Sequence, residues 1–259
     1  MALLSARGVT HRFGGLAAVS SFAIDVDQDE LVGIIGPNGA GKTTVFNLVT
    51  GIYRPTEGEM SFGGRSIVGL RPNQIAGLGI ARTFQNIRLF KDLSVLDNVR
   101  VAHYADAKYG PFEAMWRLGR LDREEERISE RSLELLTLFK LESLALSPAR
   151  SLPYGFQRRL EMARALALRP KLLLLDEPAA GMNRAETLEL MDFIRWVKRE
   201  FSLTILLIEH QMDLVMGICE RLVVLDFGIT IATGRPEEIR RNPKVLESYL
   251  GQEVHGAHG

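Results

Sequence analysis

The sequence GPNGAGKTT occupies residues 36–44 and consists of Gly36, Pro37, Asn38, Gly39, Ala40, Gly41, Lys42, Thr43 and Thr44. It matches the pattern G-x-x-x-x-G-K-[ST], which binds phosphate groups when it joins a buried strand to a helix. A uniformly apolar run, residues 31–35, precedes it, and the helix-forming sequence TTVFNLVTGI begins inside it. This stretch, called the phosphate loop below, therefore stands in the context that phosphate binding requires. The alternative interpretation is a chance glycine turn before a helix.

The residue types of the phosphate loop follow from its chemistry. Glycines let the backbone wrap around a phosphate, successive N–H groups point inward, and the following helix adds its positive end. We expect Lys42 to reach the β- and γ-phosphates of a nucleotide and the Thr43 hydroxyl to bind Mg²⁺. The pattern thus predicts a nucleotide site that includes a metal ion.

A second apolar run, residues 172–175, ends in the carboxylates of Asp176 and Glu177. We expect Asp176 to emerge at the tip of a buried strand and to hold Mg²⁺, directly or through water. Glu177 should point to the other side of the strand end and polarise an attacking water. Alone, such a run also describes a strand that simply leaves the core. Together with the phosphate loop it favours a nucleotide-hydrolysing site.

Two further polar residues follow strand-like sequence. Gln85 follows GIARTF, and His210 follows ILLIE. An amide and an imidazole at these positions can sense a γ-phosphate or position a water molecule. The alternative for His210 is a histidine that is only hydrogen-bonded in the core or at the surface.

The order of the predicted elements indicates a doubly wound, mainly parallel α/β core. Strand-like apolar sequence recurs at residues 31–35, 172–175, 203–210 (LTILLIEH) and 221–228 (RLVVLDFG), with helical sequence between these stretches. Between residues 92 and 146 strand-like runs vanish and charged, amphipathic helical sequence predominates, which predicts a helical subdomain. The ending GQEVHGAHG is small and polar, and we expect it to be frayed.

Composition restricts the class of protein. The chain has 259 residues, with 32 Lys and Arg against 32 Asp and Glu, so bulk charge favours neither nucleic acid nor acidic lipid as a partner. Its single cysteine, Cys219, excludes an intrachain disulfide and fits a reducing compartment. We expect neither a signal peptide nor a membrane-spanning segment.

These motifs, in this order, resemble the ATPase subunits of ATP-binding cassette (ABC) transporters along essentially the whole chain. The phrases RFGGLAAV, RTFQNIRLF, LDEPAAGMN and LLIEHQMDLVMGICERLVVLDFG, and the ending GRPEEIRRNPKVLESYLG, are similar to the LivG-like branch of branched-chain amino acid importers. The resemblance implies a P-loop NTPase (RecA/F1-like) α/β core with an N-terminal antiparallel β-subdomain and an inserted α-helical subdomain. The core with its β-subdomain would comprise residues 1–87 and 161–259, and the insert residues 88–160.

The resemblance also implies roles for single residues. Phe13 would stack on adenine, and residues 36–44 would bind the phosphates. Glu177 would be the catalytic base, His210 the switch histidine, and Gln85 the Q-loop residue. The implied Mg²⁺ ligands are Thr43, Gln85 and Asp176. The implied signature region, which would contact ATP bound to a second cassette, is Leu152, Pro153, Tyr154, Gly155, Phe156 and Gln157.

The signature region departs from the family pattern at Pro153. The usual serine there would offer a hydroxyl and a backbone N–H, and proline has neither. Phe156 stands where a polar glutamine is commoner. We expect the N–H groups of Gly155 and its neighbours to remain as donors and the site still to close, assisted by a partner cassette with a fuller signature.

The implied function is ATP hydrolysis that powers import of branched-chain or related hydrophobic amino acids. Implied cofactors are ATP and Mg²⁺. Implied partners are a second cassette, identical or LivF-like, two membrane permeases near Gln85 and residues 87–90, and indirectly a periplasmic binding protein, but no nucleic acid. For Ile87, Leu89 and Phe90, plain core packing remains an alternative. The chain would be soluble when isolated and act at the cytoplasmic face of the cell membrane.

Other functions stay open. One is an ABC ATPase for import of urea or another amide, or for lipid-linked export. Another is a regulator that dimerises with ATP but does not serve transport, although such proteins usually carry two cassettes or a long coiled-coil insert. A third is a cassette that binds but does not hydrolyse ATP, against which the intact Glu177, Gln85 and His210 argue.

Overall fold

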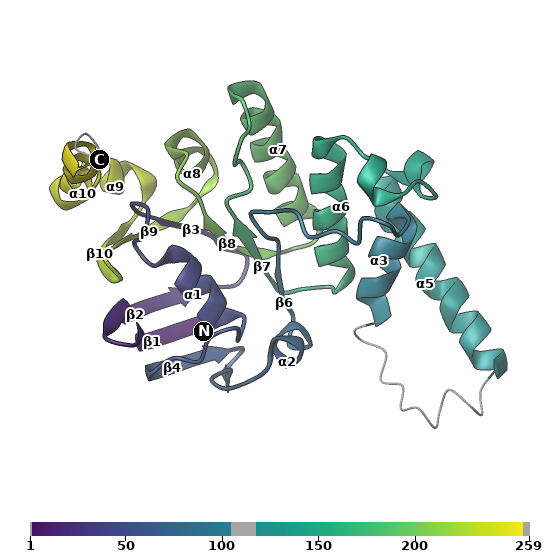
Figure 1. Cartoon of the computed structure of the whole chain (residues 1–259), viewed down its shortest axis with the longest axis horizontal. Helices are drawn as coiled ribbons and strands as arrows, with labels where there is room; N and C mark the ends of the chain where they lie inside the picture. Colours follow the sequence, from purple (N-terminus) through teal and green to yellow (C-terminus); the bar gives the residue numbers. More distant parts are fainter. Residues whose placement is uncertain (1, 105–117, 256–259) are drawn as a thin grey trace. The chain divides into compact units, whose positions relative to one another are not determined.

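The computed structural model describes residues 2–104 and 118–255 and divides the chain into two compact units (Figure 1). The first unit comprises residues 1–85 and 171–259, and the second residues 86–170. The insert expected at 88–160 is thus longer at both ends. The second unit ends after residue 160 because helix α6 (Tyr154–Ala167) continues through that position, so the residues after 160 belong to the insert. Residues 105–117, which the expected insert contains, lie outside the described residues.

A six-stranded sheet forms the centre of the first unit, in the order β10-β9-β3-β8-β7-β6. Its strands are β3 (Leu31–Ile35), β6 (Ile80–Arg82), β7 (Leu172–Asp176), β8 (Thr204–Ile208), β9 (Arg221–Asp226) and β10 (Ile229–Gly234). All neighbours are parallel except β9 and β10. Every residue of β3, β7 and β8 is buried, as uniformly apolar strands in a parallel sheet require. The predicted parallel core is confirmed.

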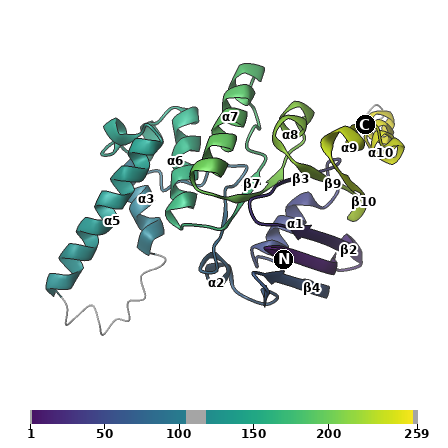
Figure 2. The same ribbon diagram turned by 180° about the vertical axis from the view of Figure 1, so that it is seen from behind.

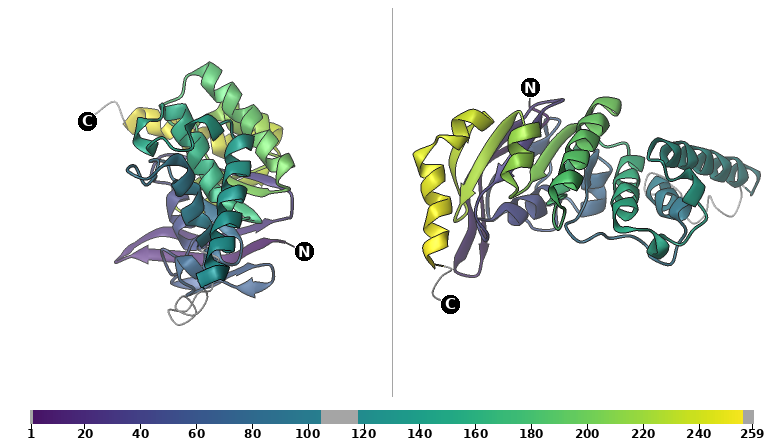
Figure 3. Two further views of the ribbon diagram at one scale, coloured as in Figure 1. Left: turned by 90° about the vertical axis from the view of Figure 1, so that its right-hand side faces the viewer. Right: turned by 90° about the horizontal axis from the view of Figure 1, so that it is seen from above.

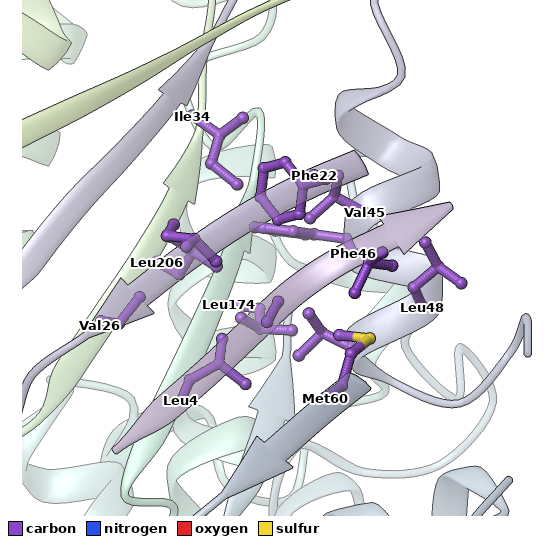
Figure 4. Close-up of a cluster of buried hydrophobic side chains, with 14 of the residues drawn as sticks. Leu4, Phe22, Val26, Ile34, Val45, Phe46, Leu48, Met60, Leu174 and Leu206 are labelled. Carbon is purple, nitrogen blue, oxygen red and sulfur yellow. The ribbon is translucent and has the colours of Figure 1, made fainter. Parts of the chain in front are cut away.

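A second, antiparallel sheet has the order β2-β1-β4-β5, which confirms the expected β-subdomain. Its strands are β1 (Leu4–Phe13), β2 (Leu16–Val26), β4 (Glu57–Phe62) and β5 (Arg65–Ser66). Helix α1 (Lys42–Val49) follows the phosphate loop. Figure 4 shows that side chains from both sheets and from α1 point into one core, with Phe22, Phe46, Leu174 and Leu206 among them. This shared core fixes the helix that carries Lys42 and Thr43.

Helices α7 (Arg184–Glu200) and α8 (Met212–Ile218) lie on the side of the parallel sheet opposite α1 and the antiparallel sheet (Figures 1 and 2). The short helix α2 (Pro72–Ala76) precedes β6. Helices α9 (Pro236–Arg240) and α10 (Pro243–His255) lie beside β10 (Figure 3). The expectation that residues 251–259 are frayed is wrong for residues 251–255, which continue α10. Once a helix is nucleated, each added residue gains a hydrogen bond at little cost.

The second unit is helical, as expected for the insert. Its helices α3 (Val95–Tyr104), α5 (Leu118–Leu138) and α6 pack on one another, with short 3₁₀ turns at Glu142–Leu144 and Ala149–Ser151. The buried Asn98 side chain accepts from the Phe90 N–H at 2.9 Å and donates to the Phe90 carbonyl at 3.0 Å. It thereby anchors the segment around Phe90. Phe90 is 49% exposed, whereas Ile87 and Leu89 are half-buried. Among the described residues, no helix has the length and apolarity that crossing a membrane requires.

The chain enters α7 through a capping box. The Asn183 side chain accepts from the N–H groups of Ala185 and Glu186 at 2.9 and 3.1 Å, and the Glu186 carboxylate accepts from the Asn183 N–H at 2.8 Å. Each of these bonds satisfies an N–H that the first helical turn leaves unpaired. The cap therefore fixes the direction in which the chain leaves the segment after β7.

Removing this cap should destabilise the protein. We expect Asn183→Ala to lower the free energy of unfolding by about 1 kcal/mol, and Asn183→Asp to retain most of it, because aspartate also caps. Urea denaturation measures both. Asn73→Ala, which changes an exposed asparagine inside α2, serves as the control and should be nearly neutral. Equal effects of Asn183→Ala and Asn73→Ala would contradict the role of the cap.

Candidate functional site

The candidate site lies where three parallel strands end. β8 lies between β3 and β7, and its last residue, Ile208, pairs with both Ile34 and Asp176. This register brings together the residues that follow the strands, namely the phosphate loop, Glu177 and His210. The carboxyl edge of a parallel α/β sheet is where ligands bind in such folds.

The phosphate loop requires its glycines. Gly36, Gly39 and Gly41 have φ angles of 147°, 80° and 98°, which side chains rarely tolerate. A Cβ on Gly36 would also collide with the Leu225 carbonyl oxygen, and one on Gly41 with the Ala18 carbonyl oxygen. The loop is therefore held close against β9 and β2 by backbone that only glycine can adopt. The predicted wrapping of the chain at residues 36–44 is what the structure has.

Lys42 is the charged group of this loop. Its side chain is buried, and Nζ donates to the carbonyl oxygens of Gly36 and Pro37 at 2.7 and 2.8 Å. Burial lowers the pKa of the ammonium group from its ordinary value, and the nearby carboxylates of Glu177 and Asp176 partly offset this effect. Lys42 is thus a cation inside the loop and close to both carboxylates. A bound phosphate can take the place of the two carbonyl oxygens as the hydrogen-bond acceptor of Nζ.

Two oxygen donors suit a magnesium ion. The Thr43 residue is exposed at the first turn of α1, and Asp176 is 5% exposed at the tip of β7. Asp176 Oδ2 is bound by Arg82 at 2.7 Å, whereas no hydrogen bond to Oδ1 is found among the described residues. Hydroxyl and carboxylate oxygens are the donors that Mg²⁺ prefers in phosphate sites. The two predicted residues therefore fit the metal ion by their chemistry.

The three predicted catalytic side chains lie together. Gln85 Nε2 donates to Glu177 Oε2 at 2.8 Å, and His210 Nδ1 lies 3.8 Å from the same oxygen. Glu177 itself has a φ of 45°, in the left-handed region, and its N–H donates to the Ile208 carbonyl at 2.9 Å. A non-glycine residue held there costs about 1 kcal/mol and is typical of functional sites. The structure thus places one carboxylate between an amide and an imidazole.

Sequence reasoning missed Glu209, which is fully buried beside His210. Its Oε1 accepts from the Ala179 N–H at 2.8 Å, and its Oε2 from the N–H groups of His210 and Gln211 at 2.8 and 3.1 Å. The Gln211 side chain also donates to the Ala179 carbonyl at 3.0 Å. One buried carboxylate thus joins the segment after β7 to the segment after β8. A charged residue at the end of a wholly apolar strand is the signal that could have found it.

Phe13 lies in an aromatic cluster at the end of β1. Its ring meets the rings of His11 and Tyr53 edge to face, with centroids 4.7 and 5.2 Å away, and His11 stacks on Tyr53 at 5.1 Å. Phe13 remains 46% exposed. His11 and Tyr53, which sequence reasoning did not single out, therefore fix a ring that keeps a free surface for stacking.

The expected signature residues lie in the second unit, at the start of α6. Pro153 has φ −55° and ψ 151° and directly precedes the helix, and its carbonyl accepts from the N–H groups of Phe156 and Gln157, both at 3.0 Å. The N–H groups of Tyr154 and Gly155 belong to the first turn and have no acceptor inside the helix. Nothing lies within 4 Å of the position of a Cβ on Gly155. The first turn of α6 therefore leaves the N–H groups of Tyr154 and Gly155 without a partner inside the helix, and the position of a Cβ on Gly155 is open.

The remaining signature side chains are held locally. The Arg158 Nη2 donates to the Tyr154 hydroxyl at 2.8 Å, and Gln157 Nε2 donates to the Leu152 carbonyl at 2.8 Å. The Arg159 guanidinium lies 5.5 Å from the Phe156 ring centroid. Arg158 and Arg159 thus lie against the two aromatic side chains of the signature region.

Comparisons with known proteins identify the family of this chain. A family profile described as "ABC transporter" matches residues 19–180, and one described as "Branched-chain amino acid ATP-binding cassette transporter" matches residues 230–255. The high-affinity branched-chain amino acid transport ATP-binding protein LivG of Salmonella typhimurium is 45% identical over 96% of this chain and 98% of its own. The corresponding protein BraF of Pseudomonas aeruginosa is 44% identical with the same coverage.

Solved structures show the same fold. A nucleotide-free ATP-binding cassette from an ABC transporter matches with a TM-score of 0.82 and 30% identity, over 96% of this chain and 99% of that one. The ADP conformation of an ATP-binding cassette matches with a TM-score of 0.82 and 30% identity, over 97% and 99%. This chain therefore belongs to the ATP-binding cassettes of the ABC transporter family, and within them to the branched-chain amino acid type.

Proposed function

We propose that this chain hydrolyses ATP to power the import of branched-chain or related hydrophobic amino acids. The observation that carries the proposal is the cluster of Glu177, Gln85 and His210 beside the phosphate loop. The full-length similarity to LivG and BraF supports the choice of cargo. The proposal assigns the chain to the cytoplasmic face of the cell membrane, where it would bind to membrane subunits.

The proposed reaction is in-line attack of water on the γ-phosphate. Glu177 would accept the proton of that water, and Gln85, which already binds Glu177 Oε2, would orient the carboxylate. Lys42 would exchange its two carbonyl contacts for phosphate oxygens and oppose the charge that develops on them. Mg²⁺, when held by Thr43, Gln85 and Asp176, supplies further neutralisation of the phosphate charge. His210 would contact the γ-phosphate, and Phe13 would stack on adenine.

The proposed working form is a dimer of cassettes. Each ATP would lie between the phosphate loop of one cassette and the signature region of the other. The free N–H groups of Tyr154 and Gly155 would bind the γ-phosphate across the interface, because a helix start attracts anions. Closure would then depend on ATP, since the two states differ in their contacts with the nucleotide. The second cassette would be a copy of this chain or a LivF-like one.

Glu177→Gln should keep ATP binding and lower the steady-state ATPase rate at least about 100-fold, because the amide cannot accept a proton. Phosphate release measures the rate, and fluorescence of a nucleotide analogue measures binding. Glu189→Gln, on the exposed face of α7, is the matched control and should keep full activity. Retained turnover in Glu177→Gln would remove Glu177 from the role of base.

Pro153→Ser should strengthen ATP-driven dimerisation about tenfold in the Glu177→Gln background, because the serine hydroxyl adds one hydrogen bond to a charged group. Analytical ultracentrifugation with ATP measures the dimer. Pro153→Ala restores only the backbone N–H and separates its effect from that of the hydroxyl. If Pro153→Ser changes neither dimerisation in the Glu177→Gln background nor the ATPase rate in the otherwise unchanged protein, the proline is neutral.

The cargo can be tested in cells. Deleting the gene should abolish uptake of radiolabelled leucine, and the unchanged chain, but not Glu177→Gln, should restore it. Co-purification from membranes should yield two permeases and identify the partner cassette. Normal leucine uptake after deletion, with loss of urea uptake or of lipid export, would assign the ATPase to one of those systems. Normal transport of all three would favour a role outside transport.

A further inference from the structure

Arg82 is a buried cation at the end of β6. Its side chain is 6% exposed, and Nη2 lies 2.7 Å from Asp176 Oδ2, in a carboxylate that is 7% exposed. A charge removed from water in this way is unfavourable unless it is paired and hydrogen-bonded. Arg82 and Asp176 therefore depend on each other.

The same guanidinium also binds the helix after the phosphate loop. Nη1 donates to Asn47 Oδ1 at 2.7 Å and approaches Thr50 Oγ1 at 3.4 Å, both in the last part of α1 or directly after it. Its carbon lies 5.4 Å from the ring centroid of Phe46 and 5.0 Å from that of Phe84. One side chain thus connects α1, β6 and the tip of β7.

Stability alone does not explain this arrangement. Replacing a buried ion pair by apolar side chains of similar volume is often neutral or stabilising. The pair instead holds the one carboxylate that stands at the end of β7 among the phosphate loop, Lys42 and Glu177. Arg82 binds Oδ2, and no hydrogen bond to Oδ1 is found in the part of the chain that the structure describes, so Oδ1 is the oxygen of Asp176 assigned to another ligand.

We infer that Arg82 is a positioning residue for magnesium binding: it fixes the Asp176 carboxylate with Oδ1 open and ties it to α1, which carries Thr43. This inference rests on the proposed function, which assigns Asp176 and Thr43 to Mg²⁺. Without Arg82, the carboxylate can rotate, and the helix loses its polar connection to β7. Binding of the ion then requires ordering that the unchanged protein already has.

The test is the Mg²⁺ dependence of nucleotide binding, which needs no turnover. Fluorescence of mant-AMPPNP, a non-hydrolysable ATP analogue, is measured on the full chain in EDTA and across a Mg²⁺ series. We expect Arg82→Met to bind the analogue in EDTA within about twofold of the unchanged protein but to need about tenfold more Mg²⁺ for half-maximal enhancement. Arg82→Lys should recover part of the shift, because lysine keeps the charge but lacks the two-pronged geometry.

An unchanged Mg²⁺ requirement in Arg82→Met would overturn the inference. A lowered requirement would also overturn it and would make Arg82 a competing cation. Arg82→Met is uninformative if it does not fold, so a second variant is needed. Asn47→Ala removes the hydrogen bond between Arg82 and α1 and keeps the Arg82–Asp176 pair. We expect it to raise the Mg²⁺ requirement by less than Arg82→Met. If neither Asn47→Ala nor Arg82→Lys changes the Mg²⁺ requirement, the inference is also overturned.

Two controls separate the possible failures. Arg221→Met breaks a different ion pair of the same unit, in which Nε lies 2.7 Å from Glu30 Oε1, and should lower the melting temperature without changing the Mg²⁺ requirement. Asp176→Asn should raise the requirement at least as much as Arg82→Met. If Asp176→Asn has no effect, the proposed metal site is wrong. If only Asp176→Asn has an effect, the site stands and the role of Arg82 fails.

Discussion

The hydrogen-bond register of β3, β8 and β7 is the constraint on which the site depends. Parallel pairing of these buried strands aligns their carboxyl ends to within a residue, so segments far apart in the chain meet at one edge. A slip of one residue would turn each side chain to the opposite face of the sheet. The carboxylates of Glu177 and Glu209, directly after β7 and β8, oppose such a slip because it would carry a charge toward the buried interior of the sheet. Packing of the core thus determines the position of the catalytic groups.

Three charged side chains are buried at the carboxyl edge of the parallel sheet, and each has different partners. Glu209 is surrounded by backbone N–H groups, Lys42 by backbone carbonyl groups, and Arg82 by a carboxylate, two polar side chains of the α1 segment and two aromatic rings. Glu209 connects two loop segments through backbone N–H groups, whereas Lys42 can exchange its two carbonyl contacts for phosphate oxygens. The edge therefore combines fixed charges, which hold loops in place, with one that is free to respond to the ligand.

The sequence predicted those parts of the site that short patterns determine. The phosphate loop, Asp176 and Glu177 were found because glycines, a lysine and apolar runs stand next to each other in the chain. Arg82 and Glu209 were missed because their partners lie 94 and 30 residues away, and one charged residue at the end of a strand does not reveal its partner. The expected end of the insert at residue 160 falls inside helix α6, because helix ends depend on contacts more than on composition.

The left-handed backbone at Glu177 bears on how this protein responds to selection. Glycine adopts that conformation without steric cost, so a stability screen that ignores ATP turnover would favour replacing the proposed base. Conversely, retention of a glutamate there under selection for growth would report that turnover, not folding, maintains it. Stabilisation and catalysis thus favour different residues at this one position, and protein engineering of the cassette must hold Glu177 fixed while it searches elsewhere.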